Sequence, residues 1–193
     1  MKKNYRGIGF YIGLVLIVIL VWYLLGNSQD TAGAYTYAEF EKALDKDEVV
    51  HYTSFEALFE SMLFFTTKRG YVKLVSGTEF ETNRSVISAT KLEPEDTIVS
   101  INQLCSHEVT AEDTRVFLLT KEGLSLTFPL EEVSQLKRSS RGVKGISLVG
   151  EDTVVFGAVF SPETTTLSYN QKALHIGKLK NRRRCARGQK NKL

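Results

Sequence analysis

Two short basic segments in the second half of the chain carry the residue types best suited to contact phosphate groups. Arg141-Gly-Val-Lys144 and Arg187-Gly-Gln-Lys190 each place a guanidinium and an ammonium group beside a glycine, which lets backbone N–H groups approach an anion closely. We therefore expect both segments to contact the phosphates of a polyanion. The candidate residues are Lys137, Arg138, Arg141, Lys144, Arg182, Arg183, Arg184, Arg187 and Lys190.

The same basic residues admit other interpretations. Glu131 and Glu132 lie close in sequence to residues 137–144, so this segment could be a solvated surface loop with balanced charge. Residues 172–193 carry nine Lys or Arg and no acid, a charge run that favours a phosphate or anionic lipid partner. An acidic part of the same chain is the alternative, because residues 27–171 contain 13 Lys and Arg against 22 Asp and Glu.

No catalytic constellation is recognisable in the sequence. Ser-His-Asp, Cys-His and paired-carboxylate patterns are not detectable, so we expect no catalytic residue and no enzyme activity of the chain's own. Cys105 and His107 lie two positions apart, but the other histidines are isolated and a metal site needs three or four ligands. We therefore predict no metal site, no cofactor and, with Cys185 so distant, no disulfide framework.

The elements that must position the basic segments are short strands arranged in repeats. From residue 62 on, β-branched and aromatic runs alternate with Gly, Asn, Pro and charged clusters, a pattern typical of strands and turns. Residues 67–70 recur 53 positions later as residues 120–123, and residues 91–99 recur 56 positions later as residues 147–155. The sequence therefore predicts two units of about 55 residues each. Gly70 and Gly123 should occupy hairpin turns that require a positive φ.

A third unit begins near the C-terminus, because residues 137–144 recur 46 positions later as residues 183–190. A period of this size with several strands per unit indicates propeller-like blades. The predicted fold class is mainly β, a partial β-pinwheel or propeller-like repeat with two blades and a truncated third. We place the two repeats at residues 54–160 and the truncated third, with its basic tail, at residues 161–193.

The series of motifs in these units resembles the C-terminal β-pinwheel repeats of the A subunits of DNA gyrase and topoisomerase IV. The motifs are Phe117-Leu-Leu-Thr-Lys-Glu-Gly-Leu124, Phe128-Pro-Leu-Glu-Glu-Val133, Ser140-Arg-Gly-Val-Lys-Gly-Ile146 and Gly150-Glu-Asp-Thr-Val-Val155. The resemblance covers about residues 50–193. It implies a non-catalytic module that binds and wraps duplex DNA through the phosphate backbone, because the DNA-cleaving part of that family is absent.

Residues 139–145 are similar to the basic, glycine-rich box that makes wrapping possible in the gyrase family. They lack that box's consecutive glycines, so an ordinary blade loop is the alternative interpretation. Base-specific recognition is not indicated, because no segment has the pattern of a recognition helix.

The N-terminal region differs from the repeats. Gly7 to Leu25 contains no charge over nineteen positions, and a helix of that length, at about 1.5 Å per residue, would cover most of the ~30 Å hydrocarbon core. Three basic residues precede this run, so the positive-inside rule puts the N-terminus in the cytoplasm. A cleaved signal peptide is the alternative, indicated by an Ala-x-Ala at residues 32–34. We predict a membrane-associated chain with one span, an anchor and linker at residues 1–34, and a short amphipathic helix and linker at residues 35–53.

Residues 1–50 resemble the N-terminus of FtsH, the membrane-bound ATP-dependent metalloprotease. The motifs are Asn4-Tyr-Arg-Gly-Ile-Gly-Phe10 and Tyr35-Thr-Tyr-Ala-Glu-Phe40. The resemblance implies, as an alternative function, a membrane-anchored extracytoplasmic interaction domain. The phosphate loop and zinc helix of that family are absent, so its ATPase and protease activities do not follow. A DNA-binding body outside the cytoplasm would not meet its substrate, which makes a chimeric or truncated reading frame a further alternative.

Overall fold

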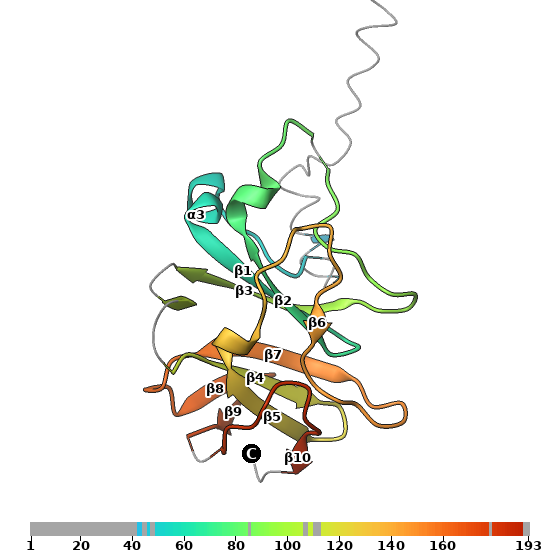
Figure 1. Cartoon of the computed structure of the whole chain (residues 1–193), viewed down its shortest axis with the longest axis vertical. Coiled ribbons are helices and arrows are strands. Elements are labelled where there is room, and N and C mark those ends of the chain that lie inside the picture. The colour runs from blue at the N-terminus through green and yellow to red at the C-terminus, as the bar shows by residue number, and fades with distance from the viewer. Residues whose placement is uncertain are drawn as a thin grey trace, which may run out of the picture.

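The computed structural model describes residues 42–43, 46, 49–84, 86–105, 108–109, 113–177 and 179–190. The predicted membrane span, Gly7 to Leu25, lies outside these residues, and so does most of the predicted amphipathic helix. The described body consists mainly of antiparallel strands, with two four-stranded sheets and one two-stranded hairpin (Figure 1).

The two four-stranded sheets are named here the first blade and the second blade. The first blade has the strand order β3-β1-β2-β6, with β1 (Ser61–Thr67), β2 (Tyr71–Ser76), β3 (Ile98–Cys105) and β6 (Val143–Lys144). The second blade has the order β10-β5-β4-β7, with β4 (Arg115–Thr120), β5 (Leu124–Pro129), β7 (Val154–Phe160) and β10 (Gln189–Lys190). The remaining elements are α3 (Phe55–Phe59), the 3-10 turns η1 (Gly77–Phe80) and η2 (Leu130–Glu132), and the hairpin of β8 (Thr166–Tyr169) and β9 (Lys172–His175).

The two blades share strand order and register. Met62 of β1 lies opposite Ser76 of β2, and Arg115 of β4 lies opposite Pro129 of β5, which is the same pairing 53 positions later. The pairs β1–β3 and β4–β7 each contain a register shift just before the last residue of the first strand. The prediction of two like antiparallel units is therefore confirmed.

The hairpin turn of each blade follows from its Thr-x-x-Gly sequence. Gly70 has a φ of 79° and Gly123 a φ of 74°, a conformation that glycine adopts without a steric penalty. Their N–H groups donate to the carbonyl oxygens of Thr67 at 2.9 Å and Thr120 at 3.0 Å. The predicted turn glycines are therefore confirmed.

An aspartate from the Glu-Asp-Thr sequence of each blade also accepts hydrogen bonds from the hairpin turn. Asp96 Oδ1 accepts from the N–H groups of Arg69 at 2.8 Å and Thr97 at 3.0 Å. Asp152 Oδ1 makes the same two contacts in the second blade, to Glu122 at 3.1 Å and Thr153 at 2.9 Å. The repeated motif thus holds the start of the last long strand against the hairpin turn.

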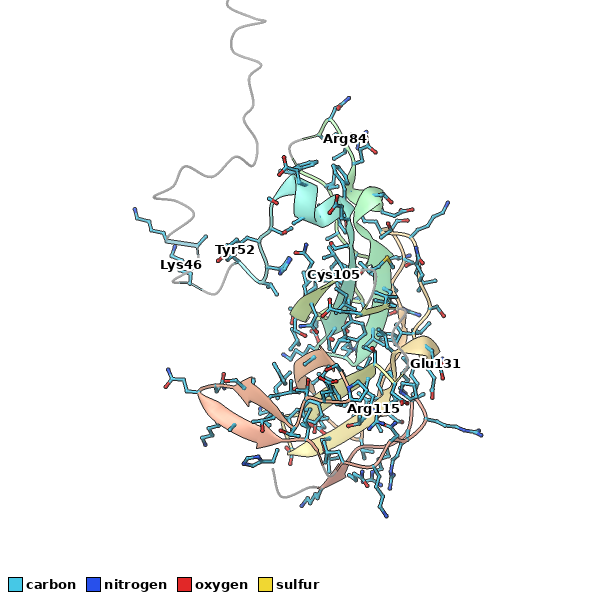
Figure 2. All side chains as sticks on the ribbon, turned by 90° about the vertical axis from the view of Figure 1, so that its left-hand side faces the viewer. Lys46, Tyr52, Arg84, Cys105, Arg115 and Glu131 are labelled. Atoms are coloured by element: carbon cyan, nitrogen blue, oxygen red, sulfur yellow. The ribbon has the colours of Figure 1, made fainter. Side chains whose placement is uncertain are left out.

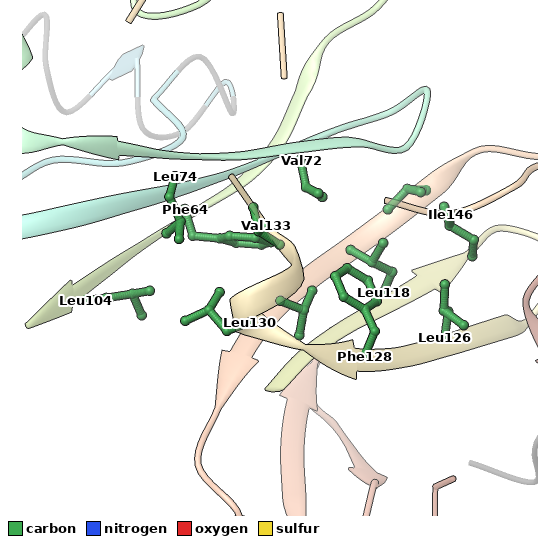
Figure 3. Close-up of a cluster of buried hydrophobic side chains, with 12 residues drawn as sticks. Phe64, Val72, Leu74, Leu104, Leu118, Leu126, Phe128, Leu130, Val133 and Ile146 are labelled. Carbon is green, nitrogen blue, oxygen red and sulfur yellow. The ribbon is translucent and has the colours of Figure 1, made fainter. Parts of the chain in front are cut away.

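The main hydrophobic core fills the space between the two blades (Figure 3). Because side chains alternate along a strand, Phe64 and Leu118 face this core while Leu63 and Phe117 face away from it. The outward face of the first blade packs against Leu58 at the end of α3 and Phe80 of η1, and the outward face of the second blade packs against the β8–β9 hairpin. The blades and their covers therefore form a stack of layers.

Each blade is completed by a strand from farther along the chain. Lys144 of β6 pairs with Tyr71 of β2, and Lys190 of β10 pairs with Leu124 of β5. The 46-residue recurrence therefore marks two equivalent strands, each of which closes the blade before it. The β8–β9 hairpin covers the second blade, and whether residues 161–193 form a separate truncated repeat stays a prediction.

The blades are in direct contact at Gly157 of β7. Ser100 Oγ donates to the Gly157 carbonyl oxygen at 2.8 Å, and Val154 N–H donates to the Lys68 carbonyl oxygen at 2.8 Å. A Cβ atom at Gly157 would lie 2.8 Å from both Cβ and Cγ2 of Thr66. The inter-blade junction therefore depends on the absence of a side chain at this position.

Candidate nucleic-acid interface

The structure joins the end of the first predicted basic segment to the middle of the second. Cys185 N–H donates to the Gly145 carbonyl oxygen at 2.7 Å, and Ser147 N–H donates to the Ala186 carbonyl oxygen at 3.0 Å. Ser147 and Arg187 also form a parallel bridge. We name residues 137–147 the first basic segment and residues 182–190 the second basic segment. Their backbones are joined at residues 145–147 and 185–187, so Lys144 and Arg187 lie next to the junction and the other candidate cations lie along the chain on either side of it.

Gly145, at the junction of the two basic segments, packs too closely against its neighbours to carry a side chain. A Cβ atom at Gly145 would lie 2.9 Å from Val72 Cγ1 and 3.1 Å from both the Gly70 carbonyl oxygen and Leu118 Cδ1. Gly145 N–H donates to that same Gly70 carbonyl at 2.7 Å. Gly145 therefore packs against the first hairpin turn and the second blade, while its carbonyl accepts from the second basic segment.

Two of the nine candidates, Arg138 and Arg184, donate from their guanidinium groups to backbone carbonyl oxygens. Arg184 N–H donates to Glu132 Oε2 at 2.6 Å, and its guanidinium donates to the carbonyl oxygens of Glu132 and Lys144, both at 2.8 Å. Arg138 makes the equivalent contacts with Glu79, at 3.3 Å to Oε2 and 3.2 Å to the carbonyl oxygen. Each blade therefore has the same pair of arginine–glutamate hydrogen bonds, which hold a basic segment against a 3-10 turn.

Arg141 is exposed but has partners. Its guanidinium forms an ion pair with Glu93 and lies over the Tyr71 ring, with 4.9 Å from Cζ to the ring centroid. Glu93 Oε2 also lies 3.7 Å from Arg69 Nη1. One carboxylate therefore lies between two guanidinium groups at the hairpin turn of the first blade.

The other six candidates have exposed side chains. Within the part of the chain that the structure describes, none of these side chains forms a hydrogen bond or an ion pair. They are Lys137, Lys144, Arg182, Arg183, Arg187 and Lys190. Arg84 lies at the opposite end of the molecule from β10, so it is not part of this set (Figures 1 and 2).

Sequence patterns gave no indication of Lys73, a buried cation that lies beneath the first basic segment. Its side chain is 1% exposed, and Nζ donates to the carbonyl oxygens of Arg138 at 2.8 Å and Ser140 at 2.9 Å. Nζ also lies 5.1 Å from the centroid of the Phe65 ring. Burial lowers the pKa of Lys73 to about 8, and the positive charge of Arg138 adds to the effect.

The lowered pKa of Lys73 predicts a pH-dependent contribution to stability. Between about pH 8 and 10.5 the lysine is charged in the unfolded chain and neutral in the folded one, so unfolding takes up a proton and stability rises with pH. The parent chain should therefore gain stability relative to a Lys73→Met variant, by up to about 1.4 kcal/mol per pH unit in this range. Denaturant unfolding of both chains at pH 7 and pH 9.5 measures the difference. An unchanged or shrinking difference would contradict the assignment.

Both cysteines of the chain lie in the part that the structure describes. Cys105 and Cys185 are free and exposed. Among the described residues, no group of three or more His, Cys, Asp or Glu side chains is placed to hold a metal ion. His107, the partner considered for Cys105, lies outside them.

Comparison with known proteins agrees with the repeat analysis. The family described as DNA gyrase C-terminal domain, beta-propeller, matches residues 61–104 and 114–161. The A subunit of DNA gyrase from Helicobacter pylori is 38% identical over 110 residues, which cover 56% of this chain and 13% of that protein. The A subunit of DNA topoisomerase 4 from Staphylococcus aureus is 30% identical over 133 residues, which cover 67% of this chain and 16% of that protein. The chain thus spans a small part of the length of these relatives.

Solved structures show the same fold. The C-terminal domain of DNA topoisomerase IV aligns with a TM-score of 0.58 and 22% identity, over 72% of this chain and 42% of that one. The C-terminal domain of DNA gyrase A aligns with a TM-score of 0.55 and 24% identity, over 68% of this chain and 43% of that one.

These findings correct the predicted membrane localisation. The matched relatives are DNA topoisomerase subunits, and no helix within the described residues is long and apolar enough to cross a membrane. The comparisons do not show the resemblance of residues 1–50 to FtsH, and they support neither a membrane nor a lipid partner.

The predicted resemblance to the β-pinwheel of gyrase and topoisomerase IV A subunits, in contrast, is supported. The matched residues include every strand of both blades except β10, and the strand order and register of the blades repeat as the sequence offsets require. The described body of this chain therefore has a mainly β, β-pinwheel-like fold, similar to that of the C-terminal domains of the A subunits of DNA gyrase and topoisomerase IV.

Proposed function

We propose that this chain is a non-catalytic module that binds duplex DNA through its phosphate backbone, without sequence preference, and wraps it. The observation that carries the proposal is the junction of the two basic segments, where Cys185 N–H meets the Gly145 carbonyl oxygen at 2.7 Å. This contact joins the two segments that carry six exposed cations, whose side chains have no partner among the described residues. Similarity to the gyrase A C-terminal domain, a DNA-wrapping module, supports the same ligand.

The shape of the elements supports phosphate contact over base reading. Direct readout inserts a helix or a two-stranded ribbon into the major groove. The six cations lie on loops and on the two-residue strands β6 and β10, neither of which is such an element. Arg138 and Arg184 are left out of the proposed contact set because their guanidinium groups already donate to protein carbonyl oxygens.

Titration of the full chain against two duplexes of equal length and unrelated sequence tests the proposal. We expect the two dissociation constants to agree within about threefold and to be micromolar or weaker at physiological salt, as for non-specific binding. Fluorescence anisotropy with labelled duplexes gives both values. A preference above about tenfold would point to base readout, and no binding at low salt would remove DNA as the ligand.

A further inference from the structure

A cleft of about 790 Å³ opens beside the hairpin turn of the first blade. Its lining includes Lys68, Arg69 and Tyr71 from that turn, Lys144 from β6, and Glu93. At this cleft the Glu93 carboxylate contacts the guanidinium groups of both Arg69 and Arg141. Two arginines that could bind a phosphate are therefore paired with a carboxylate of the same chain.

The second blade lacks this arrangement at the equivalent positions. The offset of 56 places Val149 where the first blade has Glu93, and the offset of 53 places Glu122 where it has Arg69. Arg187 is the equivalent of Arg141, and it has no ion pair within the described residues. The carboxylate between two arginines is therefore a feature of the first blade and not of the repeat.

We propose that Arg69 and Arg141, with the Tyr71 ring beneath Arg141, form a phosphate subsite that Glu93 occupies in the free chain. The inference rests on the proposed function and adds an autoinhibitory contact to it. A carboxylate and a phosphate offer oxygen acceptors of the same kind to a guanidinium, so the two anions compete for these arginines. The ion pairs are partly exposed, with side chains 32% to 52% accessible, which makes exchange with an external phosphate feasible.

Release of the two arginines should appear in the salt dependence of DNA binding. Glu93→Gln keeps the shape of the side chain and removes its charge, so the slope of log K against log salt should steepen by about 0.9 for each arginine that gains a phosphate. Glu151→Gln is the matched control, because Glu151 lines the same cleft, is exposed and has no ion pair among the described residues. The control should keep the parent slope, and equal slopes for both variants would overturn the inference.

The second blade offers the reverse experiment. Val149 is 53% exposed, so Val149→Glu should be accommodated and should place a carboxylate at the position equivalent to Glu93, near Arg187. The salt slope should become shallower by about 0.9, whereas Val149→Gln, which has the same size and no charge, should leave it unchanged. Equal slopes for these two variants would show that a carboxylate at this position does not compete with phosphate.

A measurement without DNA separates this inference from the proposed function. Inorganic phosphate is titrated into the full parent chain and the Glu93→Gln chain, and the Nε–Hε resonances of Arg69 and Arg141 are followed by NMR. We expect saturable shifts at both arginines in the variant and smaller shifts in the parent. Such shifts without DNA binding would reject the proposed function and retain the subsite. Absence of shifts in the variant would overturn the subsite even if the chain binds DNA.

Discussion

Replacing Arg182, Arg183, Arg187 and Lys190 with alanine is expected to weaken binding of the full chain to duplex DNA about 4,000-fold at 0.1 M salt. The four side chains are exposed and without partners in the described chain, so each is available for one phosphate. Each lost contact removes about 0.9 from the salt slope, which corresponds to about eightfold in affinity at 0.1 M. Fluorescence anisotropy measures the loss, and circular dichroism should show an unchanged β signal.

A second set of four cations provides the matched control for net charge. Arg84, Lys91, Lys121 and Lys172 are exposed and lie outside the two basic segments. Their replacement by alanine removes the same total charge, yet the affinity should fall by less than about tenfold, because long-range attraction is screened by salt. Similar losses for the two sets would mean that overall charge, rather than the joined basic segments, controls binding.

Much of the fold could be predicted from the repeats in the sequence. The Thr-x-x-Gly turns ending at Gly70 and Gly123, together with the offsets of 53 and 56, predicted two blades whose register the structure repeats. The pairing of β6 and β10 could not be predicted in the same way. Each is a two-residue strand that joins a partner far away in the chain, and the pattern within such a short strand does not specify its partner.

The candidate site was predictable by residue type but not by role. Arg138 and Arg184 look like the other arginines in sequence, and only the fold shows that their guanidinium groups donate to the carbonyl oxygens of Glu79 and Glu132. One signal was available, because these two glutamates recur at the offset of 53. Lys73 gave no such signal, because an exposed strand lysine and a buried one look alike in the sequence of a short β-rich run.

Gly157→Val is expected to lower the stability of the folded chain by about 3 kcal/mol or more, which corresponds to a fall in Tm of roughly 6 to 12 °C. Valine in a strand normally stabilises relative to glycine, so the predicted sign is opposite to the intrinsic preference. The cause is the inter-blade junction, where a Cβ atom would lie 2.8 Å from Cβ and Cγ2 of the fully buried Thr66. Thermal unfolding followed by circular dichroism measures the change.

A second substitution tests that cause directly. Thr66→Gly removes every atom that a Cβ at Gly157 would meet most closely. The double variant Gly157→Val with Thr66→Gly should therefore lose less stability than the sum of the two single variants, as expected for residues in direct contact. A Tm for Gly157→Val at or above that of the parent would show that the blades do not meet as described.

The salt dependence of duplex binding by the full parent chain tests the central claim most directly. Six exposed cations on the two basic segments predict a slope of log K against log salt of roughly −5.4. The affinity should therefore fall about 2,000-fold between 0.05 M and 0.2 M salt. A slope shallower than about −2, or no binding at 0.05 M salt, would contradict the claim that the joined basic segments form a phosphate-binding surface.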